Sequence, residues 1–469
     1  MSQPVNLPRW FRALLLLLAL LTCARGAWLV LHRPLIGLAN SYDEVRYSSC
    51  FNLAPIRPGV PPAEFNPQAP LRLFGFYDGF PADVCVGTSD LLFTAPIAYG
   101  WKLTEALGAA PAHSIGKLGA WRLLVWSMLL AWFTRAWLAS KRPDAAFAML
   151  ACTGLVFFDP GNTVLFNTWY AEPAAAFGLY LGCVGALLTF QTNRRLIWWA
   201  TALGSAMLAA SKMQHVMLPL LLAFACIAVA RRAGRAAALA LMFGGLIGAM
   251  FSIANGTRPA SRGIELANRG NFVLMVLLPN VDDPLQVAKN IGLSAACAAH
   301  AGPHGIWGLP GPIEQSCPSL ANVSSAHAWA SLIGEPAALA RSLGNIPYSL
   351  LPWVSNDLGM VEGGNYLHLP ASQWSLDRLF GNDPNVARLL LALPWMVFLG
   401  VLLVRADPFA RVAAAMCAVV ALEVPVVAMF GDGYSDFAKH AQLAVVASLA
   451  SLSIPLAALA QHWFACFDE

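Results

Sequence analysis

The sequence has few charged residues. Only 12% of its 469 residues are Asp, Glu, Lys or Arg, whereas 58% are hydrophobic; a soluble globular domain carries about 25% charged residues. This shortage excludes an ordinary soluble protein. The net charge of +4 is small and spread along the chain, so we expect no nucleic acid partner.

Several short motifs are also missing. No two of the 10 cysteines have the Cys-x-x-Cys spacing, which argues against a structural zinc site. The chain has no Asp-x-Asp sequence, so use of a nucleotide sugar through that motif has no support. We find no internal repeat, which weakens the case for a transporter built from inverted repeats.

Long apolar runs dominate the sequence instead. They lie at Ala13–Ala24, Leu118–Ala139, Ala145–Phe158, Pro173–Phe190, Leu196–Ala210, Val216–Ala230, Ala236–Ile253, Val386–Val404, Val412–Phe430 and Ala441–Ala460. Several approach the ~20 residues that span a bilayer as a helix, and none alternates with a period of two. Because only helices and closed barrels cross lipid, we predict an all-α polytopic membrane protein with about 10–13 helices.

The basic residues follow the positive-inside rule. They gather between alternate pairs of runs, at Arg9/Arg12, Lys141/Arg142, Arg194/Arg195, Arg231/Arg232/Arg235 and Arg405/Arg411. If these sides are cytoplasmic, both termini are cytoplasmic as well. The first run is interpreted as a retained anchor rather than a cleaved signal peptide, since it continues through Ala27–Leu31. Arg25 does not fit this pattern and is expected to snorkel outward or to face protein.

The chain divides into five segments. These are a first transmembrane helix (1–39), a first outer loop (40–117), a transmembrane core (118–254), a large outer region (255–385), and C-terminal transmembrane helices with a short cytoplasmic tail (386–469).

The two outer segments are expected to contain short elements of their own. In the first, one helix begins at Ser41, and an amphipathic helix over 89–107 would lie on the membrane surface. In the second, 272–278 is either a strand or a short helix, and 326–343 is helical.

The cysteines agree with this topology. Four of them fall in segments placed outside, Cys50 and Cys85 in the first and Cys297 and Cys317 in the second. Two cysteines in each outer segment predict two disulfides in an oxidising compartment.

Polar residues gather at the outer turns. They are Asp43, Glu44, Asp159, Glu172, Lys212, Gln214, His215, Asp432, Asp436, Lys439 and His440. Ionisable residues near membrane depth are costly and usually functional, so we expect a charged cavity that opens at the outer face.

Some of these residues also have plain structural interpretations. Glu44, three residues after Ser41, fits a capping box. Glu172 precedes Pro173 as at a helix start, and Asp159-Pro160-Gly161 is typical of a turn.

Six segments resemble a known family in order along the chain. YDEVRY after the first helix resembles the Asp-Glu motif in the first external loop of GT-C glycosyltransferases. FNTWYAEP, SKMQ, NFVLMVLLPN, DDPLQVAKNIGL and GDGYSDFAKH resemble segments of bacterial GT-C-like membrane proteins linked to surface glycans. The resemblance implies a GT-C-like bundle with outer-face juxtamembrane helices. It also implies a glycosyltransferase of the bacterial cytoplasmic (inner) membrane, with its site facing the periplasm.

The resemblance implies roles as well. The enzyme would move a sugar from a polyprenyl-phosphate donor to an envelope lipid or glycan acceptor, with Asp43 as base and Glu44 and Glu172 as further catalytic residues. The substrate-binding candidates are Asp159, Tyr170, Lys212, Gln214, His215, Asp432, Asp436, Lys439 and His440. The residue after Asp-Glu is Val45, where relatives have a small one.

Catalysis at an anomeric carbon fits these residue types. A carboxylate must take the acceptor proton, and lysines can hold the lipid phosphate. No cofactor is certain. A divalent metal bound by Asp43, Glu172, Asp432 and His440 is left open.

Three other functions are consistent with the sequence. A transporter or flippase of lipid-linked glycans would use Glu423, the acid inside a late apolar run. An O-antigen ligase or polymerase would need an Arg-rich outer surface, for which only Arg258, Arg262 and Arg269 are available. A non-catalytic assembly protein would keep the fold without the chemistry.

Overall fold

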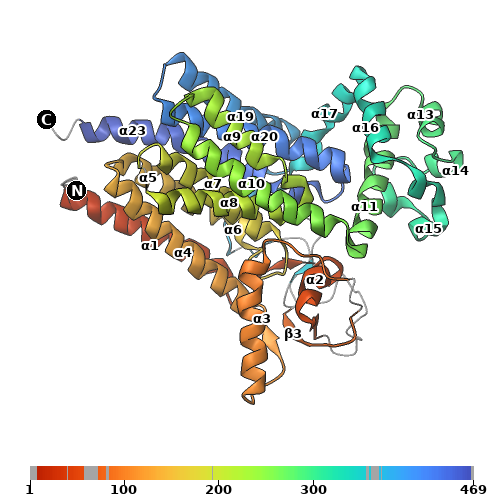
Figure 1. Ribbon diagram of the computed structural model, residues 1–469, viewed down its shortest axis with the longest axis horizontal. Helices are drawn as coiled ribbons and strands as arrows, with labels where there is room; N and C mark the ends of the chain where they lie inside the picture. The colour runs from red at the N-terminus through yellow and green to blue at the C-terminus, as the bar shows by residue number, and fades with distance from the viewer. Residues whose placement is uncertain are drawn as a thin grey trace.

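The chain folds into a helical bundle with two outer segments at one end (Figure 1). The structure is a computed structural model that describes residues 8–39, 41–56, 72–80, 84–192, 194–354, 359–360, 369–370 and 372–465. The indole rings of Trp10 and Trp463 are 5.6 Å apart. The two ends of the chain therefore lie side by side at the end of the bundle that is remote from the outer segments.

Within the described residues, seven helical segments are long and apolar enough to cross a membrane. They are α1 (Arg9–Val30), α7 (Glu172–Thr189), η3 with α9 (Met213–Ala230), α10 (Arg235–Gly256), α19 (Pro384–Leu403), α20 (Pro408–Asp432), and α22 with α23 (Gln442–Trp463). The protein is thus a multi-pass, mainly helical membrane protein, as the sequence predicts.

The remaining three apolar runs are helices too. They form α4 (Gly116–Ala139), α5 (Pro143–Cys152) with its π-helical continuation η2 (Thr153–Phe157), and α8 (Arg195–Ser211). The last two are shorter than a full span, at 15 residues for Pro143–Phe157 and 17 for α8. All ten apolar runs are therefore helical, although seven segments satisfy both length and hydropathy.

Glycines bring α7 and α8 close together. A Cβ at Gly178 would lie 2.7 Å from the Leu208 backbone nitrogen, and one at Gly204 would lie 2.4 Å from the Gly182 nitrogen. Membrane helices associate through small residues spaced in this way. The close antiparallel packing places the beginning of α7 beside the end of α8.

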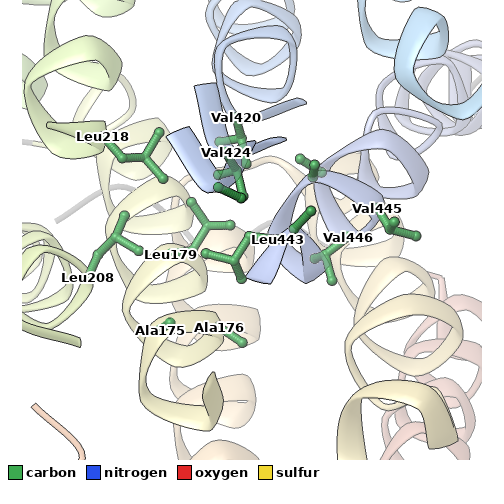
Figure 2. Close-up of a cluster of buried hydrophobic side chains, with 14 of the residues drawn as sticks. Ala175, Ala176, Leu179, Leu208, Leu218, Val420, Val424, Leu443, Val445 and Val446 are labelled. Atoms are coloured by element: carbon green, nitrogen blue, oxygen red, sulfur yellow. The ribbon is translucent and has the colours of Figure 1, made fainter. Parts of the chain in front are cut away.

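A tight apolar core lies beneath these helix ends. Figure 2 shows α7, α8, α9, α20 and α22 contributing buried side chains to it, such as Leu179, Leu208, Leu218, Val424 and Leu443. Interiors packed in this way resist small displacements. The helix ends above the core are therefore held in fixed positions relative to one another.

The first outer segment combines helices with a small sheet. It contains α2 (Ser41–Ser48), η1 (Ser49–Phe51), β2 (Leu53–Pro55), β3 (Leu73–Phe76), α3 (Leu91–Ala106) and β4 (His113–Ser114). The three strands pair antiparallel in the order β2-β3-β4. A disulfide joins Cys50 to Cys85 and fixes the end of α2 to the strand-to-α3 connection.

The second outer segment consists of short helices. These are α11 (Pro259–Asn271), η4 (Phe272–Leu277), α12 (Leu278–Asn280), α13 (Pro284–Asn290), α14 (Ala295–Ala298), η5 (Gly305–Gly308), α15 (Ile313–Ser316), η6 (Pro318–Asn322), α16 (Ser325–Gly334), α17 (Pro336–Leu350) and α18 (Asp377–Phe380). A second disulfide joins Cys297 to Cys317. Strand β5 (Gly359–Met360) pairs antiparallel with β1 (Leu38–Ala39).

Two expectations for this segment need correction. Residues 272–277 form a π-helix that continues α11, so the strand alternative is wrong. The helical prediction for 326–343 is confirmed, but it needs division into two helices, α16 and α17, separated at Glu335. Pro336 accounts for the break, because a proline begins a helix readily but disfavours helical geometry in the residue before it.

Candidate functional site

The candidate site lies where several helix ends meet. Helix α2, the beginning of α7, the end of α8 and η3 contribute to it, together with the end of α20 and the short helix α21 (Phe437–His440). The chain termini lie at the other end of the bundle. The polar residues predicted to share one face therefore do lie at one end of the bundle, although Asp159 stands apart from the cluster that the others form, as described below.

Lys439 is the central cation of the site. Its Nζ lies 3.1 Å from Asp43 Oδ2 and 2.7 Å from Asp436 Oδ2. It also stands 5.3 Å from the centre of the Tyr170 ring, within the range of a cation–π contact. Burial alone would lower the pKa of Lys439, but Asp43 and Asp436 raise it well above its usual value. Lys439 therefore stays charged although only 6% of its side chain is exposed.

Asp43 has a second cationic partner. Arg46, one turn later in α2, lies 3.0 Å from Asp43 Oδ1. Lys439 and nearby His440 lower the pKa of Asp436, which remains ionised despite its partial burial. Both carboxylates that contact Lys439 thus have positively charged neighbours that favour their charged form.

A second ion pair joins α7 to the end of α8. Lys212 Nζ donates to Glu172 Oε1 at 2.5 Å, and both side chains are nearly buried. Glu172 also lies within electrostatic reach of Lys439 and His440. The Glu172–Lys212 pair therefore belongs to the same charged cluster as Asp43.

A third pair comes from the turn after α20. His440 Nε2 lies 3.1 Å from Asp432 Oδ2. Asn271 Nδ2 donates to the other oxygen of Asp432 at 2.8 Å, so the carboxylate is held from both sides. Among the described residues, the buried Nδ1 of His440 has no hydrogen-bond partner.

Gln214 and His215 connect these pairs. Gln214 Nε2 donates to the His440 carbonyl at 2.9 Å and lies 3.1 Å from His215 Nε2. His215 Nδ1 lies 2.9 Å from Ser211 Oγ, whose proton goes to the Leu208 carbonyl. His215 therefore acts as a neutral connector in the interior rather than as an exposed cation.

The sequence reasoning missed the residue that shapes the wall of the site. Arg122 of α4 is 1% exposed and donates to the carbonyls of Phe166 at 2.8 Å and Thr168 at 2.6 Å. It also pairs with buried Asp90. Burial raises the pKa of Asp90 to about 6, although Arg122 opposes that rise. Arg122 thereby fixes the loop that carries Tyr170, and an Arg inside an apolar run was the available signal.

Glu44 occupies a different environment from its neighbour Asp43. It is fully buried, and its Oε1 accepts the backbone N–H of Trp169 at 3.0 Å. Burial raises its pKa well above the usual value, because the Trp169 bond and distant Arg122 do not compensate for lost water. Glu44 therefore holds the loop at Trp169, and the catalytic role suggested by the sequence stays a prediction.

Asp159 lies apart from the charged cluster. Its carboxylate accepts from Arg25 at 2.7 Å, from Ser375 Oγ at 2.6 Å and from the Leu376 N–H at 2.9 Å. It also caps α6 (Pro160–Thr163) through the Gly161 N–H. These partners engage both carboxylate oxygens, and the predicted role in substrate binding stays a prediction. Arg25 faces protein, which resolves its misfit with the charge pattern.

The four residues considered as metal ligands do not converge. Asp43 pairs with Lys439 and Arg46, Glu172 with Lys212, and Asp432 with His440 and Asn271. No group of three or more His, Cys, Asp or Glu suited to a metal occurs in the described part of the chain. We therefore derive no step through a metal.

An apolar cavity of about 490 Å³ lies elsewhere in the bundle, between α5, α7, α20, α22 and α23. Its lining on α7 begins at Leu179 and runs away from Glu172. At 1.5 Å per residue, Leu179 stands about 10 Å along the helix from Glu172. The cavity has its polar residues, Arg142, Asp144 and Asp407, at the end near the termini, so it is not part of the charged site.

Comparison with known proteins finds a similarity over part of the chain. Residues 122–305 match the family model of the YfdI N-terminal transmembrane domain. The match includes Glu172, Lys212 and Asn271 but neither Asp43 nor the turn over 431–440. No curated protein and no solved structure matches the chain. The matched domain and the helical spans agree in defining a multi-pass transmembrane protein.

Proposed function

We propose that the protein is a glycosyltransferase that takes a sugar from a polyprenyl-phosphate donor. The acceptor would be an envelope lipid or glycan at the outer face of the bacterial cytoplasmic membrane. The observation that carries the proposal is the arrangement of Asp43, Lys439 and Asp436, in which one buried lysine is shared by two carboxylates. A carboxylate that can take the acceptor proton and a cation that can hold a phosphate are thus side by side.

The reaction would use Asp43 as the base. Asp43 takes the proton of an acceptor hydroxyl while that oxygen forms a bond to the anomeric carbon of the donor sugar. The bond from that carbon to the phosphate oxygen breaks, and its electron pair leaves with polyprenyl phosphate. A positioned carboxylate contributes about 10²- to 10⁴-fold to such a step.

The charge balance of the cluster suggests how the base is released. Every lysine in the cluster already contacts a carboxylate, Lys439 with Asp43 and Asp436 and Lys212 with Glu172. A phosphate that contacts Lys439 would therefore compete with Asp43 for that cation. The loss of a cationic partner makes a carboxylate more basic, so donor binding would prepare Asp43 to accept the proton.

The test is sugar transfer by the purified protein in nanodiscs. Radiolabelled polyprenyl-phosphate hexoses serve as donors and envelope lipids as acceptors, and Asp43→Asn is compared with wild type. We expect a loss of at least 100-fold in turnover with donor binding retained. Asp282→Asn is the matched control, because Asp282 is an exposed outer carboxylate paired with Arg341. Turnover that survives in Asp43→Asn would remove Asp43 from the chemistry.

One observation favours a second function. Glu423 of α20 is 8% exposed, and neither of its oxygens has a hydrogen-bond partner in the described chain. An isolated carboxyl in a membrane helix is typical of a proton-coupled carrier. A flippase of lipid-linked glycans would lose movement of its substrate in Glu423→Gln, whereas a transferase would retain turnover in that variant.

A further inference from the structure

Trp307 is an exposed aromatic side chain on the rim of the charged cluster. It lies in η5 and is 71% exposed. Its indole N–H donates to Ser435 Oγ at 3.2 Å. Ser435 is in the turn that carries Asp432 and Asp436, and its backbone N–H donates to the Asp432 carbonyl at 3.3 Å. A single exposed tryptophan needs no explanation by itself, but this one is attached to the site.

A buried hydrogen bond to Asn271 holds the loop that carries Trp307. Asn271 Oδ1 accepts the backbone N–H of Ile306 at 3.1 Å, while its Nδ2 donates to Asp432. Asn271 is 2% exposed. One buried amide therefore sets both the position of the loop and the orientation of a site carboxylate.

Two glycines permit this close approach. Gly305 has φ +53°, and a Cβ there would lie 2.5 Å from Asn271 Oδ1. Gly433 has φ +63°, and a Cβ there would lie 3.0 Å from the Asn271 carbonyl oxygen. Both turns adopt a backbone conformation that glycine tolerates and other residues rarely do. The two glycines thus allow the loop that carries Trp307 and the turn over 431–440 to pack closely around Asn271.

An indole held beside carboxylates is suited to one chemical class of ligand. A pyranose ring has a face of C–H groups that packs on an aromatic surface, while its hydroxyls donate to carboxylates. Fixing the ring in advance reduces the entropy lost on binding. Asp432 and Asp436 are the acceptors nearest to Trp307 along the turn.

We infer that Trp307 is the stacking platform for a sugar ring, beside Asp432 and Asp436. The inference rests on the proposed function in that it names the sugar subsite of the same cluster. It adds a residue that lies outside the charged pairs and beyond the matched family domain, which ends at residue 305. Trp307 would fix the orientation of the bound sugar and contribute to specificity, and it would take no part in proton transfer.

The test measures sugar binding without turnover. Asp43→Asn protein in nanodiscs is exposed to methyl hexopyranosides, with acyclic sorbitol as control, and saturation transfer to the ligand protons is recorded by NMR. We expect transfer to the protons of one ring face and little to sorbitol. Trp307→Ala should weaken the signal about 3- to 10-fold, and Trp307→Phe should retain part of it.

Trp329→Ala is the matched control. Trp329 is 41% exposed, and its indole donates to the Phe430 carbonyl near the end of α20 rather than to Ser435. Its removal should leave the signal unchanged, and thermal unfolding of both variants verifies the fold. Three results would refute the platform. They are no saturation transfer in Asp43→Asn protein that keeps Trp307, saturation transfer retained in Trp307→Ala, or an equal loss in Trp307→Ala and Trp329→Ala.

Two further results distinguish the sugar platform from a membrane anchor and from the proposed transferase activity. Quenching by chain-brominated lipids that disappears in Trp307→Ala would place the indole in the bilayer as an interfacial anchor, and would overturn the platform. Pyranoside binding that depends on Trp307, together with no sugar transfer from any donor, would leave the platform standing and reject the transferase.

Discussion

Lys439 and Asp43 lie 396 positions apart in the chain, yet Nζ of one stands 3.1 Å from Oδ2 of the other. The contact joins the turn before the last membrane helices to the helix that follows the first. Lys439 has a second carboxylate, Asp436, at 2.7 Å. The lysine therefore holds together the first outer segment and the C-terminal part of the bundle.

Lys439→Met should destabilise the protein as well as inactivate it. Asp436 would lose its cation and Asp43 would keep only Arg46, although just 20–25% of these two carboxylates is exposed. We expect a loss of about 2 kcal/mol. Thermal unfolding in detergent measures it. Lys289→Met serves as control, because Lys289 lies on the exposed surface of α13. An equal shift in both variants would contradict the role of Lys439.

Glu44 should tolerate loss of its charge but not loss of its oxygen. Burial keeps its pKa raised, and a glutamine carbonyl can still accept the Trp169 N–H. We expect Glu44→Gln to retain stability and turnover within about twofold. Glu44→Ala leaves that buried N–H unpaired, which costs about 1–3 kcal/mol. Inactive but stable Glu44→Gln protein would instead restore the catalytic role predicted from the sequence.

The Lys439–Asp436 pair should be insensitive to pH over a wide range. The pKa of Asp436 is lowered, so its contribution to stability is present above the unfolded value of about 3.9 and is lost as pH falls below it. The pKa of Lys439 is raised, so its contribution is present below about 10.4 and is lost as pH rises further.

The measurement is the difference in unfolding temperature between wild type and Lys439→Met at several pH values. That difference should be constant from pH 5 to pH 9. A step within that range would contradict the assignment of the coupling to the lysine pair.

The helices could be predicted from the sequence, but the contacts between them could not. All ten apolar runs become helices because hydropathy and length determine membrane helices almost alone. The single-sided placement of Asp43, Glu172, Lys212 and Lys439 followed from topology. Which cation pairs with which carboxylate depends on α7–α8 packing at Gly178 and on the turn over 431–440, and neither follows from composition.

Two residues at the site were not among the predicted site residues. Asn271 begins the family-like segment NFVLMVLLPN, which pointed to no particular role, and Trp307 lies in a Gly/Pro-rich stretch. Their contacts form only where α11, η5 and the turn after α20 meet. Glu44 and Asp159 were assigned to the site by sequence neighbourhood. The structure turns both toward buried backbone N–H groups, because adjacent residues on a helix or turn point in different directions.

Asp159 and Asp43 should respond in opposite ways to the same substitution. Asp159→Asn removes the charge that pairs with Arg25 at 2.7 Å in a side chain with no exposed surface. It also disturbs the bonds from Ser375 and Leu376. We expect a loss of about 3 kcal/mol in stability. In nanodiscs at low temperature, the KM for the donor should not change, since no partner of Asp159 belongs to the charged cluster.

The two readouts separate structural support from chemistry. In Asp43→Asn we expect turnover to fall by at least 100-fold while the unfolding temperature stays close to wild type, because Arg46 and Lys439 keep polar partners there. Asp159→Asn protein that unfolds at the wild-type temperature but has a raised KM would show that Asp159 contacts substrate. The charged site would then have to extend from α21 past α6 to the loop at Ser375.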